Sequence, residues 1–306
     1  MNVTYVDENF LWVCLMSNGA FSYFADVSPP KVNHVIVCVI NILLSFSTTF
    51  LNAITVLAYW SSSRLQKKTS YFLVMLLSLG DLVVGAVCNP VYVVLLIKDL
   101  KRDANCPLAS EFLILSFCLF GMSFTTLFLL NMERYLSIIY PIFHRLKVTK
   151  FRLLIASFVM WCVVAMNACI LIVDEEIGKI ILSSEICIFL IILIFIYGKI
   201  FRAAREMARN RISGGGTAST KAFLPNIKLA KSCLIVVCCN ILCFSPMAIT
   251  TSLWKLPLDG WILWSWSCTL VLSSSTLNSV IFFWRNQILR SEAKKILRQT
   301  FLDFNG

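Results

Sequence analysis

The most informative segment of this sequence is residues 107–139, PLASEFLILSFCLFGMSFTTLFLLNMERYLSII. Between Glu111 and Glu133 it contains 21 residues without Asp, Glu, Lys, Arg or His. A helix needs roughly 20 apolar residues to cross the hydrocarbon core of a bilayer. The segment therefore predicts a membrane-spanning helix with charged residues close to both of its ends.

The composition of the whole chain agrees with this prediction. Of the 306 residues, 58% are hydrophobic and 14% are charged, which leaves too little polar surface to cover a soluble core of this size. We expect an all-α membrane protein, a seven-transmembrane helix bundle over residues 34–284, preceded by an extracellular tail over residues 1–33. The apolar segments run over residues 34–60, 71–97, 107–139, 152–173, 180–203, 229–254 and 261–284.

The basic residues indicate how the bundle is oriented. The alternate gaps that follow the first, third, fifth and seventh segments contain 21 of the 27 Lys and Arg residues. Cytoplasmic loops carry such an excess, so we expect a multi-pass protein of the cell membrane with its N-terminus outside and its C-terminus in the cytoplasm. Asn2-Val3-Thr4 fits a glycosylation acceptor, a weak signal that requires the same orientation.

Residues 285–306 predict a cytoplasmic amphipathic helix and tail. Basic side chains occupy one face of this helix and apolar side chains the other. Such a helix lies at the interface of an anionic leaflet, which makes membrane lipids a partner. The alternative is a solvated amphipathic tail. The apolar residues are Ile288, Leu289, Ala293, Ile296, Leu297 and Phe301, and the basic ones are Arg290, Lys294, Lys295 and Arg298.

Two other classes of protein fit the sequence poorly. The net charge of +11 does not indicate a nucleic-acid partner, because the charges lie in the gaps between apolar segments. The histidines are His34 and His144, and most of the 13 cysteines lie inside apolar runs. Neither a His/Cys metal site nor a His-activated nucleophile is apparent, so we do not expect an enzyme.

Ionisable residues at membrane depth are costly and mark functional sites by default. Asp81 lies in the second segment, Glu133 and Arg134 lie at the end of the third, and Glu185 lies in the fifth.

These residues belong to an ordered set of short motifs that resembles the rhodopsin-like (class A) G-protein-coupled receptors over roughly residues 34–300. The missing fifth-helix proline at Phe189 and the very short second external loop resemble the melanocortin, cannabinoid and lysophospholipid branch, near which adenosine receptors are grouped. The motifs are Asn52 in LNAITV, Asp81 in LSLGDL, Glu133-Arg134-Tyr135, Trp161, Cys243-Phe244-Ser245-Pro246 and Asn278-Ser279-Val280-Ile281-Phe282.

The resemblance implies a switch in which Arg134 rests on Glu133 in the inactive state and contacts a heterotrimeric G protein in the active state. Three departures from the family pattern bear on this switch. Asn226 stands where many members carry an acid that restrains the arginine, so we expect elevated basal activity. Ser279 replaces a proline, and Phe282 replaces a tyrosine. The other implied switch residues are Tyr135, Tyr197, Phe244, Pro246 and Asn278.

The resemblance also implies a Na⁺ ion beside Asp81 and Ser123. Oxygen ligands of this kind suit a hard cation. The alternative is a hydrogen-bonded polar core that contains water and no ion. No other cofactor is expected. The residues that would surround the ion are Asn52, Asp81, Ser123, Ser274, Ser275 and Asn278.

The extracellular ligand is not identified by the sequence. Glu111 and Glu185 favour a ligand with a basic group, such as a peptide, although both could be glutamates at headgroup level without such a role. Ser116 stands where amine receptors carry an aspartate and Leu272 where opsins carry a lysine, which argues against a monoamine and against retinal. The floor of the expected pocket would be lined by Phe117, Phe120, Phe244 and Met247.

We therefore expect a receptor that couples an extracellular ligand to a G protein. A non-signalling binding protein of receptor fold is the alternative, and a small transporter or channel is a weaker one. An external disulfide could involve Cys14, Cys106, Cys169, Cys187 or Cys268, and the sequence does not select a pair.

Overall fold

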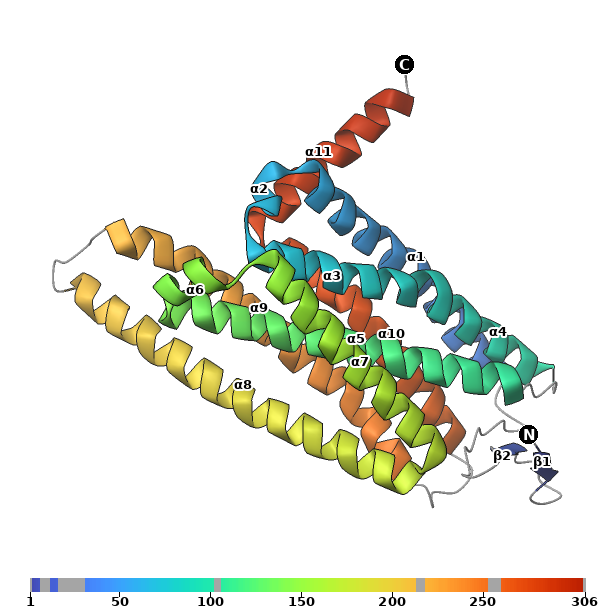
Figure 1. Ribbon diagram of the computed structural model, residues 1–306. Helices are drawn as coiled ribbons and strands as arrows, with labels where there is room; N and C mark the ends of the chain where they lie inside the picture. Colours follow the sequence, from blue (N-terminus) through green and yellow to red (C-terminus); the bar gives the residue numbers. More distant parts are fainter. Residues whose placement is uncertain are drawn as a thin grey trace.

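The computed structural model describes residues 2–5, 12–15, 31–101, 106–212, 218–252 and 260–304. Within these residues the protein is a bundle of long helices (Figure 1), and seven of its helical segments are long and apolar enough to cross a membrane. They are Val32–Ser61, Thr69–Leu100, Pro107–Ile139, Lys150–Val173, Ser183–Glu206, Lys231–Thr250 and Ile262–Arg285. The predicted all-α bundle with seven spans is confirmed.

The second span is divided by a π-helical turn, and short helices follow the first and third spans. The spans are formed by α1 (Lys31–Ser61), α3 (Thr69–Val83) with η1 (Val84–Cys88) and α4 (Asn89–Leu100), α5 (Cys106–Ile139), α7 (Lys150–Val173), α8 (Glu175–Ile212), α9 (Ala218–Ser252) and α10 (Gly260–Arg285). The short helices are α2 (Ser63–Gln66) and α6 (Pro141–Lys147).

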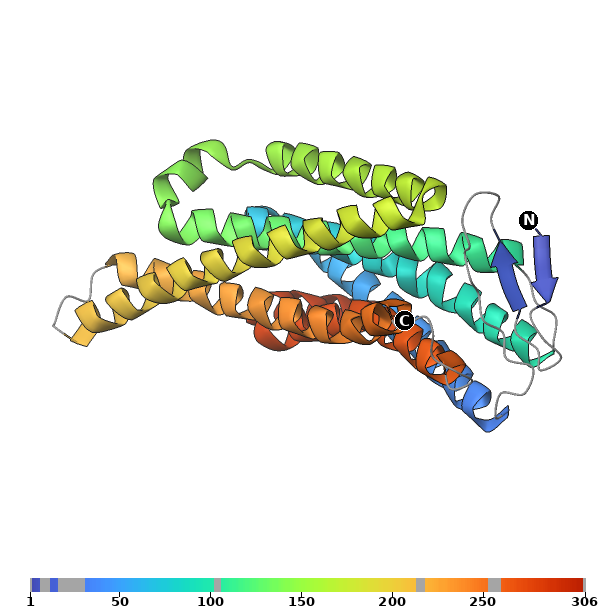
Figure 2. The ribbon, with the colours of Figure 1, turned by 90° about the horizontal axis from the view of Figure 1, so that it is seen from below.

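An antiparallel hairpin that the sequence analysis did not predict precedes α1. Strand β1 (Asn2–Tyr5) pairs with β2 (Trp12–Leu15), with Asn2 opposite Leu15. Asn2 of the glycosylation acceptor thus lies in β1, and its side chain is outside the described residues. Figures 1 and 2 show the hairpin at one end of the bundle and α6 at the other.

The outer surface of the helices is apolar, as a lipid-facing surface requires. Phe46 is 72% exposed, Ile194 is 74% exposed and Leu242 is 70% exposed. Hydrocarbon solvates such side chains, whereas backbone and side-chain polar groups must find partners inside the protein. Most of the polar side chains discussed below point inward for this reason.

Helices α1 and α10 are joined by polar side chains along most of their length. Each contact pairs a residue near one end of the chain with a residue more than 220 positions later. Interhelical hydrogen bonds and close packing replace the hydrophobic effect between helices in a membrane. The contacts are Trp266 Nε1 to Asn33 Oδ1 (3.0 Å), Asn41 Nδ2 to Thr269 Oγ1 (2.9 Å), Thr48 with Thr276 through their hydroxyls, and Ser279 Oγ to Asn52 Oδ1 (2.6 Å).

Helix α11 (Gln287–Phe304) occupies the segment for which the amphipathic helix was predicted. Its Leu289 and Ala293 are buried while Arg290 and Lys294 are exposed. Asn286 Oδ1 accepts a hydrogen bond from the backbone N–H of Ile288 at 3.2 Å and so caps the helix. The helix packs against α1 and leaves the bundle at the end opposite the hairpin (Figure 1).

The π-helical turn η1 packs closely against α1 at Gly85. Ser45 Oγ donates to the Gly85 carbonyl at 2.8 Å. A Cβ on Gly85 would lie 2.7 Å from the Thr49 backbone nitrogen, which cannot move aside as a flexible side chain would. Glycine therefore lets the two helix backbones approach at this point.

We expect Gly85→Ala to lower the free energy of unfolding by about 1–3 kcal/mol, the usual cost of overpacking. Thermal unfolding of the purified protein in detergent measures this loss. Gly198→Ala is the matched control, because nothing lies within 4 Å of a Cβ there and alanine favours a helix. Equal midpoints for the two variants would contradict the close approach.

Candidate functional site

Two clusters of buried polar residues lie inside the bundle. The Asp81 cluster joins helices in the middle of the membrane-spanning region, and the Glu133 cluster lies at the end of the bundle that carries α6. Both are built from residues that the sequence analysis selected and from others that it missed.

Asp81 is the centre of the first cluster and is fully buried in α3. Ser123 on α5 donates from Oγ to Asp81 Oδ1 at 3.1 Å. Asn278 on α10 donates from Nδ2 to Asp81 Oδ2 at 3.0 Å. The carboxylate thus joins three helices, because each of its oxygens accepts a hydrogen bond from a different one.

Amides extend this cluster to two more helices. Asn240 on α9 donates from Nδ2 to Asn278 Oδ1 at 2.8 Å. On the other side, Asn52 on α1 donates to the Ser275 carbonyl at 3.4 Å and accepts from Ser279 Oγ. The sequence analysis missed Asn240, although a lone amide in the apolar run CLIVVCCNILCF (residues 233–244) could have marked it.

The donor set around Asp81 fits a hard monovalent cation. Ser274 Oγ donates to the Val271 carbonyl at 2.6 Å, which leaves its lone pairs available. Ser275 is buried, and its hydroxyl lies beside the Asp81 carboxylate. Hydroxyl oxygens around a buried carboxylate can bind either a water or a hard cation, so the residues present suit both readings of this core.

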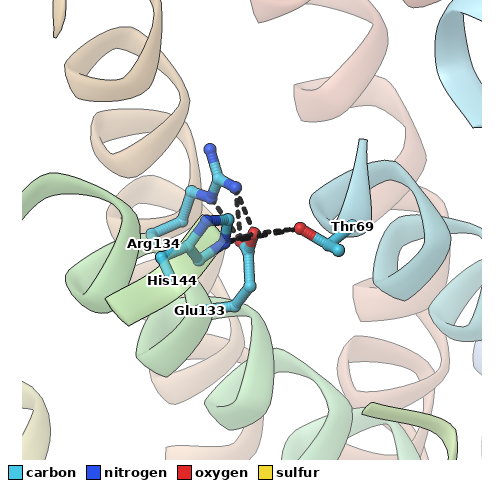
Figure 3. Close-up of polar contacts among 4 residues, drawn as sticks. All are labelled: Thr69, Glu133, Arg134 and His144. Carbon is cyan, nitrogen blue, oxygen red and sulfur yellow. Dashed lines mark hydrogen bonds and ion pairs between the residues drawn. The ribbon is translucent and has the colours of Figure 1, made fainter. Parts of the chain in front are cut away.

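The Glu133 cluster brings four side chains together (Figure 3). Arg134 donates from Nε to Glu133 Oε2 at 2.6 Å and from Nη2 to Oε1 at 2.5 Å. Thr69 at the start of α3 donates to Oε1 at 2.5 Å, and His144 Nε2 lies 2.8 Å from the same oxygen. An ionised carboxylate only accepts hydrogen bonds, so His144 Nε2 is the donor.

This cluster is buried although it is highly polar. Glu133 is 1% exposed and Arg134 is 5% exposed. A buried ion pair is tolerated only when further hydrogen bonds satisfy it, and Thr69 and His144 supply them. The sequence analysis predicted neither partner. His144 stands just beyond the Glu-Arg-Tyr motif and could have been suspected, whereas Thr69 carries no comparable signal.

Tyr197, Tyr135 and Phe282, three other residues considered for the switch, lie outside this cluster. Tyr197 is buried in α8 and donates to Asn131 on α5. Tyr135 packs edge-on against Tyr140, with ring centroids 5.9 Å apart. Phe282 is buried in an apolar cluster that includes Tyr71.

Asn226 lies in α9, with its side chain outside the described residues.

Phe189, which stands where a proline was expected, forms an aromatic stack between α8 and α5. Its ring centroid lies 4.5 Å from that of Phe128 and 5.7 Å from that of Phe124, with nearly parallel planes. Trp161 on α7 donates from Nε1 to Thr126 Oγ1 on α5 at 3.2 Å. Helix α5 is therefore held to both neighbours beside the Asp81 cluster.

The half of the bundle away from α6 contains the expected pocket residues. Phe120 on α5 and Phe244 on α9 meet edge-on with centroids 5.5 Å apart, and Met247 packs into the same apolar cluster. Ser116 is buried in this half. Phe117 and Pro246 are partly buried, and Glu111 is exposed on α5.

The Glu185 side chain contacts α7. Asn167 on α7, which the sequence analysis missed, donates from Nδ2 to Glu185 Oε2 at 2.8 Å. An amide is neutral, so this bond leaves the negative charge of the carboxylate uncompensated. Among the side chains that the structure describes, no cation pairs with Glu185.

Three of the five cysteines considered for an external disulfide are unbonded in the structure. Cys169, Cys187 and Cys268 are free thiols. The side chains of Cys14 and Cys106 lie outside the described residues.

Comparison with known protein families gives a match over most of the chain. Residues 51–283 match the family described as 7 transmembrane receptor (rhodopsin family). A search of individual curated proteins returns no match.

We expect His144→Ala to loosen α6, whose residues are otherwise only partly buried or exposed. A hydrogen bond to a charged group contributes about 1.5–3 kcal/mol, so amide exchange over residues 141–147 should rise about tenfold or more. Hydrogen–deuterium exchange with mass spectrometry measures this. The exposed neighbour Arg145→Ala should leave exchange unchanged; a similar rise in both variants would refute the anchoring role of His144.

Proposed function

Because the chain belongs to the rhodopsin family of seven-transmembrane receptors, we propose that it couples an extracellular ligand to a heterotrimeric G protein. The observation that carries this proposal is the buried Glu133–Arg134 pair at one end of a seven-span bundle. An arginine buried against a carboxylate is available to a partner only after that contact is released. The cluster therefore supports two states, one with Arg134 paired and one with Arg134 open to the G protein.

Helix α9 is the element whose movement would expose Arg134. Its Cys233 and Val236 are fully buried in the same apolar cluster as Leu130, one turn before Arg134 on α5. Ser232, next to Cys233, accepts a hydrogen bond from Arg285 Nε on α10 at 3.4 Å. An outward movement of the α6 end of α9 would separate these contacts and open a cleft beside Arg134.

The α6 end of the bundle faces the cytoplasm in this proposal. The gaps at that end carry 21 of the 27 Lys and Arg residues, in accord with the positive-inside rule. The hairpin β1–β2 lies at the other end (Figure 2), which would then be extracellular. Helix α11 would lie on the cytoplasmic leaflet, where its exposed basic side chains meet anionic lipid.

The ligand would enter from the hairpin end and carry a basic group. The Glu185 carboxylate pairs with no cation among the described side chains, and this supports the proposal because a charge at such a depth favours a cationic partner. Phe120, Phe244 and Met247 would form the floor of the site. Phe244 belongs to α9, as does Asn240. A ligand that contacts this floor would therefore contact α9 directly.

A sodium ion would be held by Asp81, Ser123 and Ser275, with Asn52, Ser274 and Asn278 around them. When bound, the ion would supply a positive charge that balances the buried Asp81 carboxylate. The residues themselves align α3, α5 and α10 around that carboxylate, with or without the ion.

We expect Arg134→Ala to abolish ligand-induced G-protein activation at an unchanged surface level. Glu133→Gln should raise ligand-independent activation roughly fivefold, because a neutral acceptor binds arginine less strongly than a carboxylate does. A nucleotide-exchange assay on membranes measures both effects.

Arg64→Ala, an exposed arginine on α2, should behave as the wild type. A transporter or a non-signalling binding protein would be indifferent to Arg134→Ala, so retained function in that variant would refute the receptor mechanism.

We expect Na⁺ to stabilise the protein relative to choline at equal ionic strength. At a concentration ten times the dissociation constant, ligand linkage contributes about 1.4 kcal/mol, or a rise in Tm of about 2–4 °C. Asp81→Asn should remove the difference between the two salts. Asp174→Asn, which changes the residue that caps α8, should keep it. No salt difference in the wild type would favour the water-filled core.

A further inference from the structure

Asn240 interrupts the buried face of α9. Between residues 233 and 243 the other buried side chains of this helix are Cys233, Val236, Val237 and Cys243, all apolar. An amide at such a position is costly in a membrane unless both its donor and its acceptor find partners. Asn240 is 6% exposed, and one amide hydrogen reaches the Val236 carbonyl at 2.8 Å within its own turn.

The second amide hydrogen of Asn240 leaves the helix and reaches Asn278 Oδ1 on α10 at 2.8 Å. The direction of this hydrogen bond is set by the Asp81 carboxylate, which Asn278 also contacts. An ionised Asp81 only accepts, so Asn278 must turn its Nδ2 toward Asp81. Its Oδ1 must then face α9, where only a donor can satisfy it.

We propose that Asn240 is a latch that holds α9 in the closed position, with Arg134 paired to Glu133. The latch consists of the contacts from Asn240 to Asn278 and from Asn278 to Asp81. It rests on the proposed function, in which α9 moves away from α5. Asn240 acts as a positioning residue, because it is buried in the bundle and acts through Asn278.

Opening α9 breaks the latch and leaves the Asn278 carbonyl without a donor. Asn278 is 2% exposed and Asp81 is fully buried, so water reaches them with difficulty while the bundle stays packed. The loss of this hydrogen bond therefore opposes the outward movement of α9 in the resting receptor. A variant without the Asn240 amide starts from a closed state that already lacks the bond, and it opens more readily.

Cys233 reports the position of α9 independently of any G protein. It is fully buried two turns before Asn240, close to Glu133 and Arg134. Outward movement of this end of α9 would expose the thiol to the cleft beside Arg134. Cys238 on the lipid face and Cys268 in the far half of the bundle are free thiols that serve as references.

The experiment compares maleimide labelling of these three cysteines in purified wild type, Asn240→Leu and Asn240→Ala in nanodiscs, with peptide mass spectrometry as the readout. Hydrogen bonds between membrane helices shift such an equilibrium roughly three- to fifteenfold, and labelling of a transiently exposed group follows the open population. We expect Cys233 to react faster by this factor in both variants, with Cys238 and Cys268 unchanged. Ligand-independent nucleotide exchange should rise in parallel.

Leu242→Ala is the matched control, since Leu242 lies two residues from Asn240 on the lipid face. It should leave both labelling and exchange unchanged. Faster labelling of Cys233 without any G-protein activation would support the latch but refute the proposal that movement of α9 activates a G protein.

If Cys233 in folded Asn240→Leu or Asn240→Ala were labelled at the same rate as in the wild type, the latch proposal would be overturned. An equal increase at Cys233 and Cys268 would also overturn it, because that result indicates general loosening of the bundle. If Asn240→Leu does not fold, Asn240→Ala carries the same measurement.

Discussion

A carboxylate inside a membrane bundle has to be solvated by the protein itself, and Asp81 imposes this requirement on the helices around it. Ser123 and Asn278 satisfy one oxygen each, so α5 and α10 are fixed relative to α3. Asn240 then fixes α9 relative to α10. The arrangement of the bundle centre follows from one charge and from the order in which donors and acceptors must alternate around it.

The same rule governs the Glu133 cluster, with a different outcome. There the carboxylate accepts from an arginine and from two neutral or titratable donors, Thr69 and His144, which come from α3 and α6. Thr69 and His144 both contact Glu133 Oε1, so Arg134 shares that oxygen with them, whereas its Nε donates to Oε2. When the arginine departs, Oε1 keeps the donors Thr69 and His144, while Oε2 loses the hydrogen bond from Arg134 Nε.

The sequence predicted the helices well because each span is a long apolar run and because basic residues collect in alternate gaps. It also singled out Asp81, Glu133 and Arg134, since charges within such runs are conspicuous, and the structure places all three inside the bundle. It did not predict Asn240, Asn167 or Thr69, whose importance depends on which helix stands opposite. The periodicity of apolar residues identifies the buried face of a helix but not the helix that packs against it. Hydrogen bonds between residues far apart in the sequence were therefore not predicted. The hairpin and the π-helical turn at η1 were missed because neither alters the apolar pattern.

The contacts between α1 and α10 have a consequence for biosynthesis. Helix α1 enters the membrane first, with Asn33, Asn41, Thr48 and Asn52 on the face that will later meet α10. Their partners are translated more than 220 residues afterwards. Until then these side chains need other hydrogen-bond partners, such as water, the insertion machinery or a chaperone. Nascent chains truncated before residue 266 would keep that polar face uncovered, which is a feature that cellular quality control can recognise.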